Sequence, residues 1–167
     1  MGVEKERLRH ARVVVTGASD GTINVWDAGR RKVFRSLIAH ADGVAAGALS
    51  PDNRHILSGG ADGVILVWSF PACELLSTTQ AHAGRVRSLA MAADCRSIVS
   101  AGHDRKVRVW RFPDMTPLAA FVADSAVTAV AASADGRLIV AADAQGCAHF
   151  LRLEEPGTPA SATVRDP

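Results

Sequence analysis

Three tryptophans stand at a constant interval in this chain of 167 residues. They are Trp26, Trp68 and Trp110, so the interval is 42 residues (68 − 26 = 110 − 68 = 42). The same interval separates two sets of polar residues, which are Asp20, Asp62 and Asp104 and, four residues before each of these, Thr16, Ser58 and Ser100. Several columns in one register indicate a repeated structural unit, and such units must stack on one another to bury a core.

The repeat also has a histidine column and a fourth copy. His40 and His82 lie 42 residues apart, whereas the next position of that column holds Asp124. In the fourth copy the serine, aspartate and tryptophan columns are filled by Ala141, Gln145 and Leu151. The sequence therefore predicts about four copies, of which the second and third are the most complete.

Each copy has the pattern of short strands separated by turns. Runs rich in β-branched residues, such as Val64–Ser69 and Val86–Met91, alternate with turn signals built on Pro, Asp, Asn and Gly. The second strands of the two clearest copies are expected at Arg54–Ser58 and Ser97–Ser100. Four antiparallel strands in a unit of this length are typical of one propeller blade, so the sequence predicts an all-β chain.

With these columns in place, the chain resembles the WD-repeat (WD40) β-propeller family. The segment Ala39-His40…Ser58…Asp62…Trp68 is similar to the family's Gly-His…Trp-Asp unit, and the next copy repeats the pattern. The family's Trp-Asp dipeptide survives only as Trp26-Asp27, and alanine replaces the glycine before each histidine. The resemblance covers about residues 11–153 and implies a β-propeller fold of WD-type blades.

The resemblance also implies a hydrogen-bond network inside each complete blade. In such blades the histidine bonds the turn aspartate, the aspartate also bonds the serine or threonine, and the indole N–H donates to that hydroxyl. We therefore expect two complete structural networks and one partial one, which are His40–Ser58–Asp62–Trp68, His82–Ser100–Asp104–Trp110 and Thr16–Asp20–Trp26. The last blade is expected to have none. Because the same residue set recurs in two copies, a hydrolase triad is rejected.

Counting strand-like runs predicts where the blades begin and end. The propeller segment, 11–153, divides into blades at about 11–38, 43–79, 85–122 and 126–153. It follows a charged segment, 1–10, and precedes a tail, 154–167, whose Pro, Gly, Ser and Ala content indicates disorder. The first blade has no evident inner strand and the last no evident outer strand. We therefore expect an open partial propeller whose exposed edges favour self-association or the addition of blades from elsewhere.

Charge and cysteine content exclude several classes of protein. The chain has 19 basic and 17 acidic side chains, a balance that does not favour nucleic-acid binding. The three cysteines form no CxxC pair and no histidines have metal-ligand spacing, so neither a disulfide framework, a metal site nor a cofactor is predicted. The absence of a signal peptide and of a long apolar run predicts an intracellular, cytoplasmic protein, with the nucleus left open, that binds neither membrane nor small-molecule substrate.

One segment resembles part of an enzyme. The run Val13-Val14-Val15-Thr16-Gly17-Ala18-Ser19 is similar to the start of a short-chain dehydrogenase, where a glycine loop holds a dinucleotide. Such a loop needs a helix behind it, but Thr22–Trp26 alternates like a strand. The third glycine is absent, and the chain has no tyrosine for the family's catalytic step. The dehydrogenase alternative is therefore disfavoured, and the chain is predicted not to be an enzyme.

These features predict a non-catalytic scaffold that presents loops to other proteins within a larger complex. The turns beside the aspartates and the loops before the inner strands are expected on one face, which makes four residues candidate partner contacts: Ser19, Asp42, Arg85 and His103. A short similarity of Asp143–Leu153 to closing blades of NACHT-type signalling ATPases gives an alternative, a C-terminal regulatory propeller of a larger ATPase.

Overall fold

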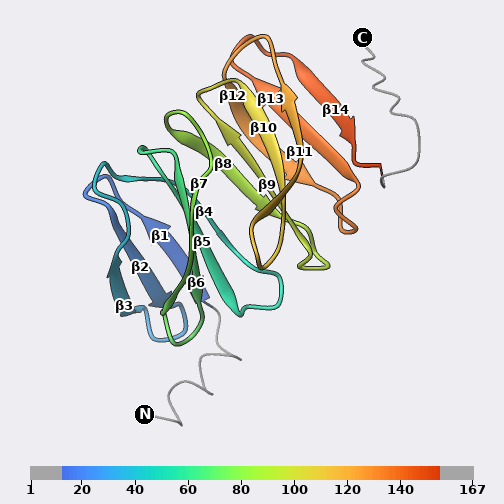
Figure 1. Ribbon diagram of the computed structural model, residues 1–167. Coiled ribbons are helices and arrows are strands. Elements are labelled where there is room, and N and C mark those ends of the chain that lie inside the picture. Colours follow the sequence, from blue (N-terminus) through green and yellow to red (C-terminus); the bar gives the residue numbers. More distant parts are fainter. Residues whose placement is uncertain (1–12, 155–167) are drawn as a thin grey trace.

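The computed structural model describes residues 13–154, and every regular element in that range is a β-strand. The strands form four separate antiparallel sheets that stand side by side in chain order (Figure 1). Within each sheet, consecutive strands pair with each other, so each sheet is a simple meander. The prediction of an all-β chain of about four blade-like sheets in an open arrangement is confirmed.

The strand bounds are as follows. The first sheet holds β1 (Val13–Gly17), β2 (Thr22–Asp27) and β3 (Lys32–Ile38). The second holds β4 (Val44–Leu49), β5 (His55–Gly60), β6 (Val64–Ser69) and β7 (Leu75–Gln80). The third holds β8 (Val86–Met91), β9 (Ser97–Gly102), β10 (Lys106–Arg111) and β11 (Thr116–Val122). The fourth holds β12 (Val127–Ala132), β13 (Leu138–Asp143) and β14 (Ala148–Arg152). The predicted segment 1–10 and all but the first residue of the predicted tail 154–167 lie outside the described residues.

The second strand of each four-stranded sheet is longer than the sequence predicts. β5 runs to Gly60 and β9 to Gly102, whereas the sequence pattern ends both strands at the serine, because glycine counts as a turn signal. A Cβ on Gly60 would collide with the ring of His40, and one on Gly102 with the ring of His82. The strand continues through the glycine because a histidine ring occupies the space of the missing side chain.

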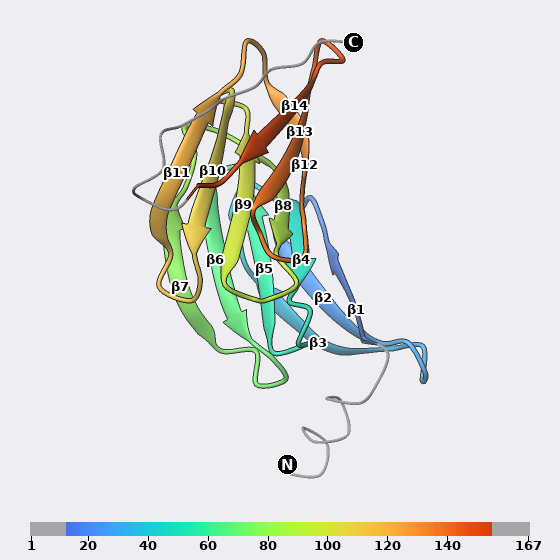
Figure 2. The same cartoon turned by 90° about the vertical axis from the view of Figure 1, so that its right-hand side faces the viewer.

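The sheets are stacked through the first strand of each, which is an inner strand in all but the first sheet, where β1 is the counterpart of the second strands β5 and β9. β1 lies against β4, β4 against β8, and β8 against β12. Figure 2 shows the successive sheets turned relative to one another, as expected for twisted meanders packed face to face. We call the face of a sheet that meets the next sheet its forward face, and the opposite face its rear face.

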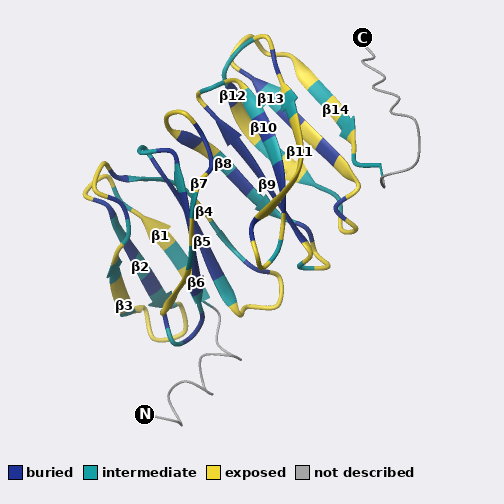
Figure 3. Ribbon diagram, in the orientation of Figure 1, coloured by how far each residue is buried: buried dark blue, intermediate teal, exposed yellow. Residues whose placement is uncertain are grey.

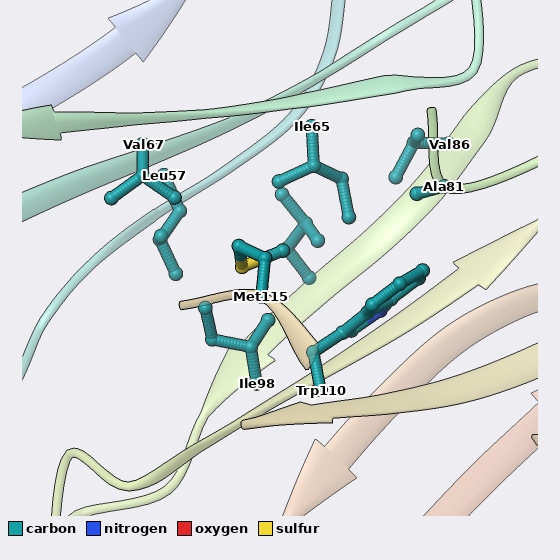
Figure 4. Close-up of a cluster of buried hydrophobic side chains, with 9 residues drawn as sticks. Leu57, Ile65, Val67, Ala81, Val86, Ile98, Trp110 and Met115 are labelled. Atoms are coloured by element: carbon teal, nitrogen blue, oxygen red, sulfur yellow. The ribbon is translucent and has the colours of Figure 1, made fainter. Parts of the chain in front are cut away.

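Each interface between sheets joins one cross-strand pair of the earlier sheet to one of the later sheet. On the forward face of the second sheet, Leu57 of β5 is paired with Val67 of β6. On the rear face of the third sheet, Ile98 of β9 is paired with Trp110 of β10. These four side chains share one buried apolar cluster, in which Met115 lies among them (Figure 4).

The other two interfaces follow the same rule. Between the first and second sheets, the pair Val15–Val25 shares a cluster with the pair Ile56–Trp68. Between the third and fourth sheets, the pair Val99–Val109 shares a cluster with the pair Ile139–Leu151. Burial follows these three interfaces, and much of the exposed sheet surface lies at the two ends of the stack (Figure 3). The core of this protein therefore lies between sheets.

We expect Leu57→Ala to destabilise the fold by about 2–5 kcal/mol, because it removes a fully buried side chain from the second interface. Leu75→Ala is the matched control, since Leu75 of β7 is half-exposed, and its effect should stay within about 0.5 kcal/mol. Urea unfolding of the wild type and the two variants measures the change in unfolding free energy. Equal shifts of the midpoint would contradict the position of the core.

Candidate functional site

The third sheet contains a chain of hydrogen bonds that begins at its tryptophan. Trp110 Nε1 donates to Ser100 Oγ at 2.8 Å, and Ser100 Oγ lies 2.8 Å from His82 Nε2. His82 Nδ1 in turn lies 2.8 Å from Asp104 Oδ1. An indole N–H only donates and a carboxylate only accepts, which fixes the order of the protons. Ser100 donates to the imidazole, and the imidazole Nδ1–H donates to Asp104.

Arg108 of β10 completes this network. Its Nη1 donates to Asp104 Oδ2 at 2.9 Å. The same Nη1 lies 2.8 Å from His82 Nδ1, but this approach is not a hydrogen bond, because both nitrogens are donors in the proton order above. Burial alone would raise the pKa of Asp104, but hydrogen bonds from His82 and Arg108 lower it to about 2. Burial lowers the pKa of His82, and the neighbouring Asp104 only partly offsets this. At neutral pH the pair is therefore a neutral imidazole beside an ionised carboxylate, which agrees with the proton order above.

The second sheet repeats the network in a looser form. Trp68 Nε1 donates to Ser58 Oγ at 3.3 Å, His40 Nε2 lies 3.0 Å from Ser58 Oγ, and His40 Nδ1 lies 3.2 Å from Asp62 Oδ2. The side chain of Asp62 is 29% exposed, against 10% for Asp104. A leucine fills the position that Arg108 takes in the third sheet. The third sheet therefore has the tighter and more polar of the two networks.

The order of groups differs from the order implied by the family resemblance. In both sheets the imidazole lies between the aspartate and the serine and bonds each of them. Within these two networks, no direct bond joins the aspartate to the serine. The histidine is thus the central member, because only an imidazole has two ring nitrogens that face opposite ways and bond both partners at once.

The partial network of the first sheet separates into two parts. Trp26 Nε1 donates to Thr16 Oγ1 at 2.9 Å. Asp20 instead accepts hydrogen bonds from the backbone N–H and the hydroxyl of Thr22, and these bonds lower its pKa. Because no imidazole bridges them, Asp20 bonds only within its own turn, and Thr16 accepts a hydrogen bond from Trp26 without being linked to the aspartate.

The fourth sheet contains a polar cluster that the sequence reasoning missed. Asp143, at the end of β13, is buried, and its Oδ2 lies 3.1 Å from His149 Nε2. The backbone N–H groups of Gln145 and Cys147 donate to Asp143 Oδ1 at 2.9 and 3.0 Å. Burial acts to raise the pKa of Asp143, but the bonds from His149 and from the two N–H groups lower it overall. The expectation for the last blade concerned only the columns filled by Ala141, Gln145 and Leu151, and this cluster lies outside those columns.

The space left by the missing histidine explains this cluster. Asp143 stands in the column of Gly60 and Gly102, where any side chain would collide with the histidine ring. In the fourth sheet the histidine column holds Asp124, which is exposed, so the space is open to the side chain of Asp143. The signal in the sequence was the paired change, in which glycine became aspartate in the same copy that lost its histidine.

The four candidate contact residues all lie on exposed loops at one end of the sheets. Alternating strand directions place the β1–β2, β3–β4, β7–β8 and β9–β10 connections at the same end, and these carry Ser19, Asp42, Arg85 and His103. His103 N donates to the carbonyl of Arg85 at 2.9 Å, which holds these two loops together. Gly43, with φ of 95°, lies against the backbone of Ser19, so the first two loops also touch.

Charge is divided along this end of the molecule, which we call the loop face. Over the first two sheets the exposed charged residues are acidic, with Asp20 and Asp42. Over the third sheet they are basic, with Arg85 and Arg105, and His103 lies beside them. The sequence shows a balanced total charge, whereas on the loop face the fold places basic residues over the third sheet, between the acidic residues of the first two sheets and the exposed Asp124 of the β11–β12 loop.

The described residues give no sign of a metal centre or a membrane helix. Within 13–154, no group of three or more His, Cys, Asp or Glu side chains is arranged to hold a metal ion. In the same range, no helix has the length and apolar character needed to cross a membrane.

Two models of protein families match the chain. A model described as "WD domain, G-beta repeat" matches residues 8–27 and 31–69, which include the first two sheets as far as β6. A model described as "TEP-1 C-terminal beta-propeller" matches residues 82–153, which include the third and fourth sheets. A comparison with curated proteins found no match.

We expect Ser100→Ala to destabilise the fold by about 1–3 kcal/mol, because it leaves the buried indole N–H of Trp110 and the Nε2 of His82 without their partner. Ser19→Ala, at an exposed turn, is the matched control and should change little. Urea unfolding measures both. A Ser100→Ala midpoint that equals the Ser19→Ala midpoint would contradict a stabilising network.

Acid should weaken the fold through Asp104 and His82 together. Asp104 has a lower pKa folded than unfolded, so its contribution is present above its ordinary pKa and is lost between roughly pH 5 and pH 2. His82 is held neutral in the fold, so the unfolded chain gains a proton first as the pH falls below its ordinary pKa. The slope of unfolding free energy against pH should be smaller in Asp104→Asn. Identical slopes below pH 5 would oppose this assignment.

Proposed function

Because this chain is built from the repeats of the WD-repeat β-propeller family, we propose that it is a non-catalytic scaffold that binds other proteins through its loop face. The propeller fold typically serves as a protein-interaction module, and its rigid sheets hold loops in a fixed arrangement. The two complete hydrogen-bond networks support this role, because each one ties the loop before an inner strand to the turn beside it.

The observation that carries the proposal is the division of charge across exposed, mutually bonded loops. Arg85 and His103 are joined through the backbone, and Arg105 is joined in the same way to Ala123 of the next loop. Side chains on such loops lose little freedom when a partner binds, because the backbone beneath them is already fixed. The partner surface that fits best is acidic where it meets the third sheet and basic where it meets the first two.

We expect Arg85→Glu to weaken partner binding and to reduce the dependence of the association rate on salt, because it reverses a charge on the loop face. Arg96→Glu is the matched control, since Arg96 is also exposed on the third sheet but lies at the opposite end. Partners captured by the wild-type chain are identified by mass spectrometry, and their binding to each variant is then measured with purified proteins. Equal loss of binding in both variants would contradict the loop face as the binding surface.

A second candidate function is a C-terminal regulatory propeller of a larger signalling ATPase. The observation that favours it is the match of residues 82–153 to a model described as a C-terminal propeller. The coding sequence upstream of Met1 separates the two candidates. A Gly-x-x-x-x-Gly-Lys-Ser/Thr loop in the same reading frame would support the ATPase, and an in-frame stop codon directly upstream would oppose it.

A further inference from the structure

The forward face of the fourth sheet is built like an interface and is left uncovered. Val140 of β13 is paired across the strands with Phe150 of β14, and their side chains are 38% and 64% exposed. These two residues occupy the columns of the pairs Leu57–Val67 and Val99–Val109, whose members are all buried between sheets. Leu138 lies on the same face two residues before Val140 and is also exposed. The last sheet therefore presents the apolar half of one more interface.

The rear face of the first sheet presents the other half. Val14 of β1 is paired with Trp26 of β2, and Val14 is 48% exposed. This pair occupies the columns of Ile56–Trp68 and Ile98–Trp110, whose members are buried in the two interfaces that follow. Trp26 is only half-buried, whereas Trp68 and Trp110 are buried.

The two open faces are complementary in the same way as the faces that meet at the internal interfaces. Each of the three internal interfaces joins an aliphatic pair on a forward face to a pair on a rear face, and that rear pair holds tryptophan in two of the three. Val140–Phe150 is an unmatched forward pair and Val14–Trp26 an unmatched rear pair. They lie on the first and last sheets of the stack, at its two ends (Figure 1), so one chain does not join them.

We propose that a second copy of this chain joins them. The fourth sheet of each copy packs its forward face on the rear face of the partner's first sheet. Two copies with four sheets each make a ring of eight, which is within the range of closed propellers. A head-to-tail contact of this kind is heterologous, and it gives a finite ring when its rotation closes. The net charge of +2 gives little repulsion between copies.

Light scattering and sedimentation equilibrium on the full chain test the proposal. The chain has a mass of 17.5 kDa, and we expect a species of twice that mass. Phe150→Glu and Val14→Glu should each convert it to a monomer, because each places a charge in one half of the interface. Leu75→Glu is the matched control, since Leu75 is also exposed but lies on the outer strand β7, away from both faces, and it should leave the dimer unchanged.

Mixing the variants tests the head-to-tail arrangement. Phe150→Glu keeps its rear face and Val14→Glu keeps its forward face, so an equimolar mixture should associate at least tenfold more tightly than either variant alone. A wild-type chain that is monomeric at every concentration, or one that grows beyond two copies, would overturn the closed ring. A dimer lost in Phe150→Glu but kept in Val14→Glu would show a symmetric contact between two fourth sheets and would also overturn it.

Folding controls keep these outcomes interpretable. All variants should retain the far-ultraviolet circular dichroism and the cooperative melting of a folded β-protein, because every substituted side chain is substantially exposed. Leu138→Glu repeats the test of the forward face on another strand and should also give a monomer. Arg85→Glu should stay dimeric, so that failure of the ring and failure of the loop face as a partner surface are recognised separately.

Discussion

A buried imidazole that bonds a serine on one side and an aspartate on the other is the interaction on which the two central sheets depend. In the third sheet, His82 joins the loop before β8, the second strand at Ser100 and the turn at Asp104. The loop is thereby fixed, at one end of the sheet, to a strand and a turn that lie 18 and 22 residues further along the chain. The tryptophan N–H completes the network and directs its ring into the interface with the preceding sheet, so the same network positions both the loop face and part of the core.

The space that the imidazole fills accounts for the differences between copies. Where the ring is present, the adjacent strand residue must be glycine, as at Gly60 and Gly102. In the fourth sheet the histidine column holds Asp124, the glycine becomes Asp143, and that carboxylate is satisfied by His149 and two backbone N–H groups. A buried carboxylate needs such partners, because an unpaired charge away from water is costly. The copies differ in the residues that they use, but in each of them the buried polar side chains have hydrogen-bond partners.

Two kinds of surface result from this construction, and they serve different contacts. The loop face is polar, with opposite charges over neighbouring sheets, and is suited to a partner recognised by charge. The terminal sheet faces are apolar and repeat the side-chain pairs of the internal interfaces, as Val140–Phe150 and Val14–Trp26 do. They are suited to another sheet of the same kind. An association through the ends would leave the loop face free, so scaffold and assembly roles are compatible in one chain.

The sequence by itself determined the period, the four copies and the all-β class, because each depends on spacing along the chain. The members of the two central networks stand in the repeated columns, and the resemblance to the WD-repeat family implied that they bond to one another. Strand limits differed by a residue or two where glycine had been counted as a turn. Only the tertiary structure decided the order within the networks, the addition of Arg108, the replacement cluster at Asp143 and the separation of charge on the loop face. These depend on which side chains lie close together after the sheets have stacked. Column positions in a repeat do not predict, for example, that Asp143 fills the space of the missing histidine.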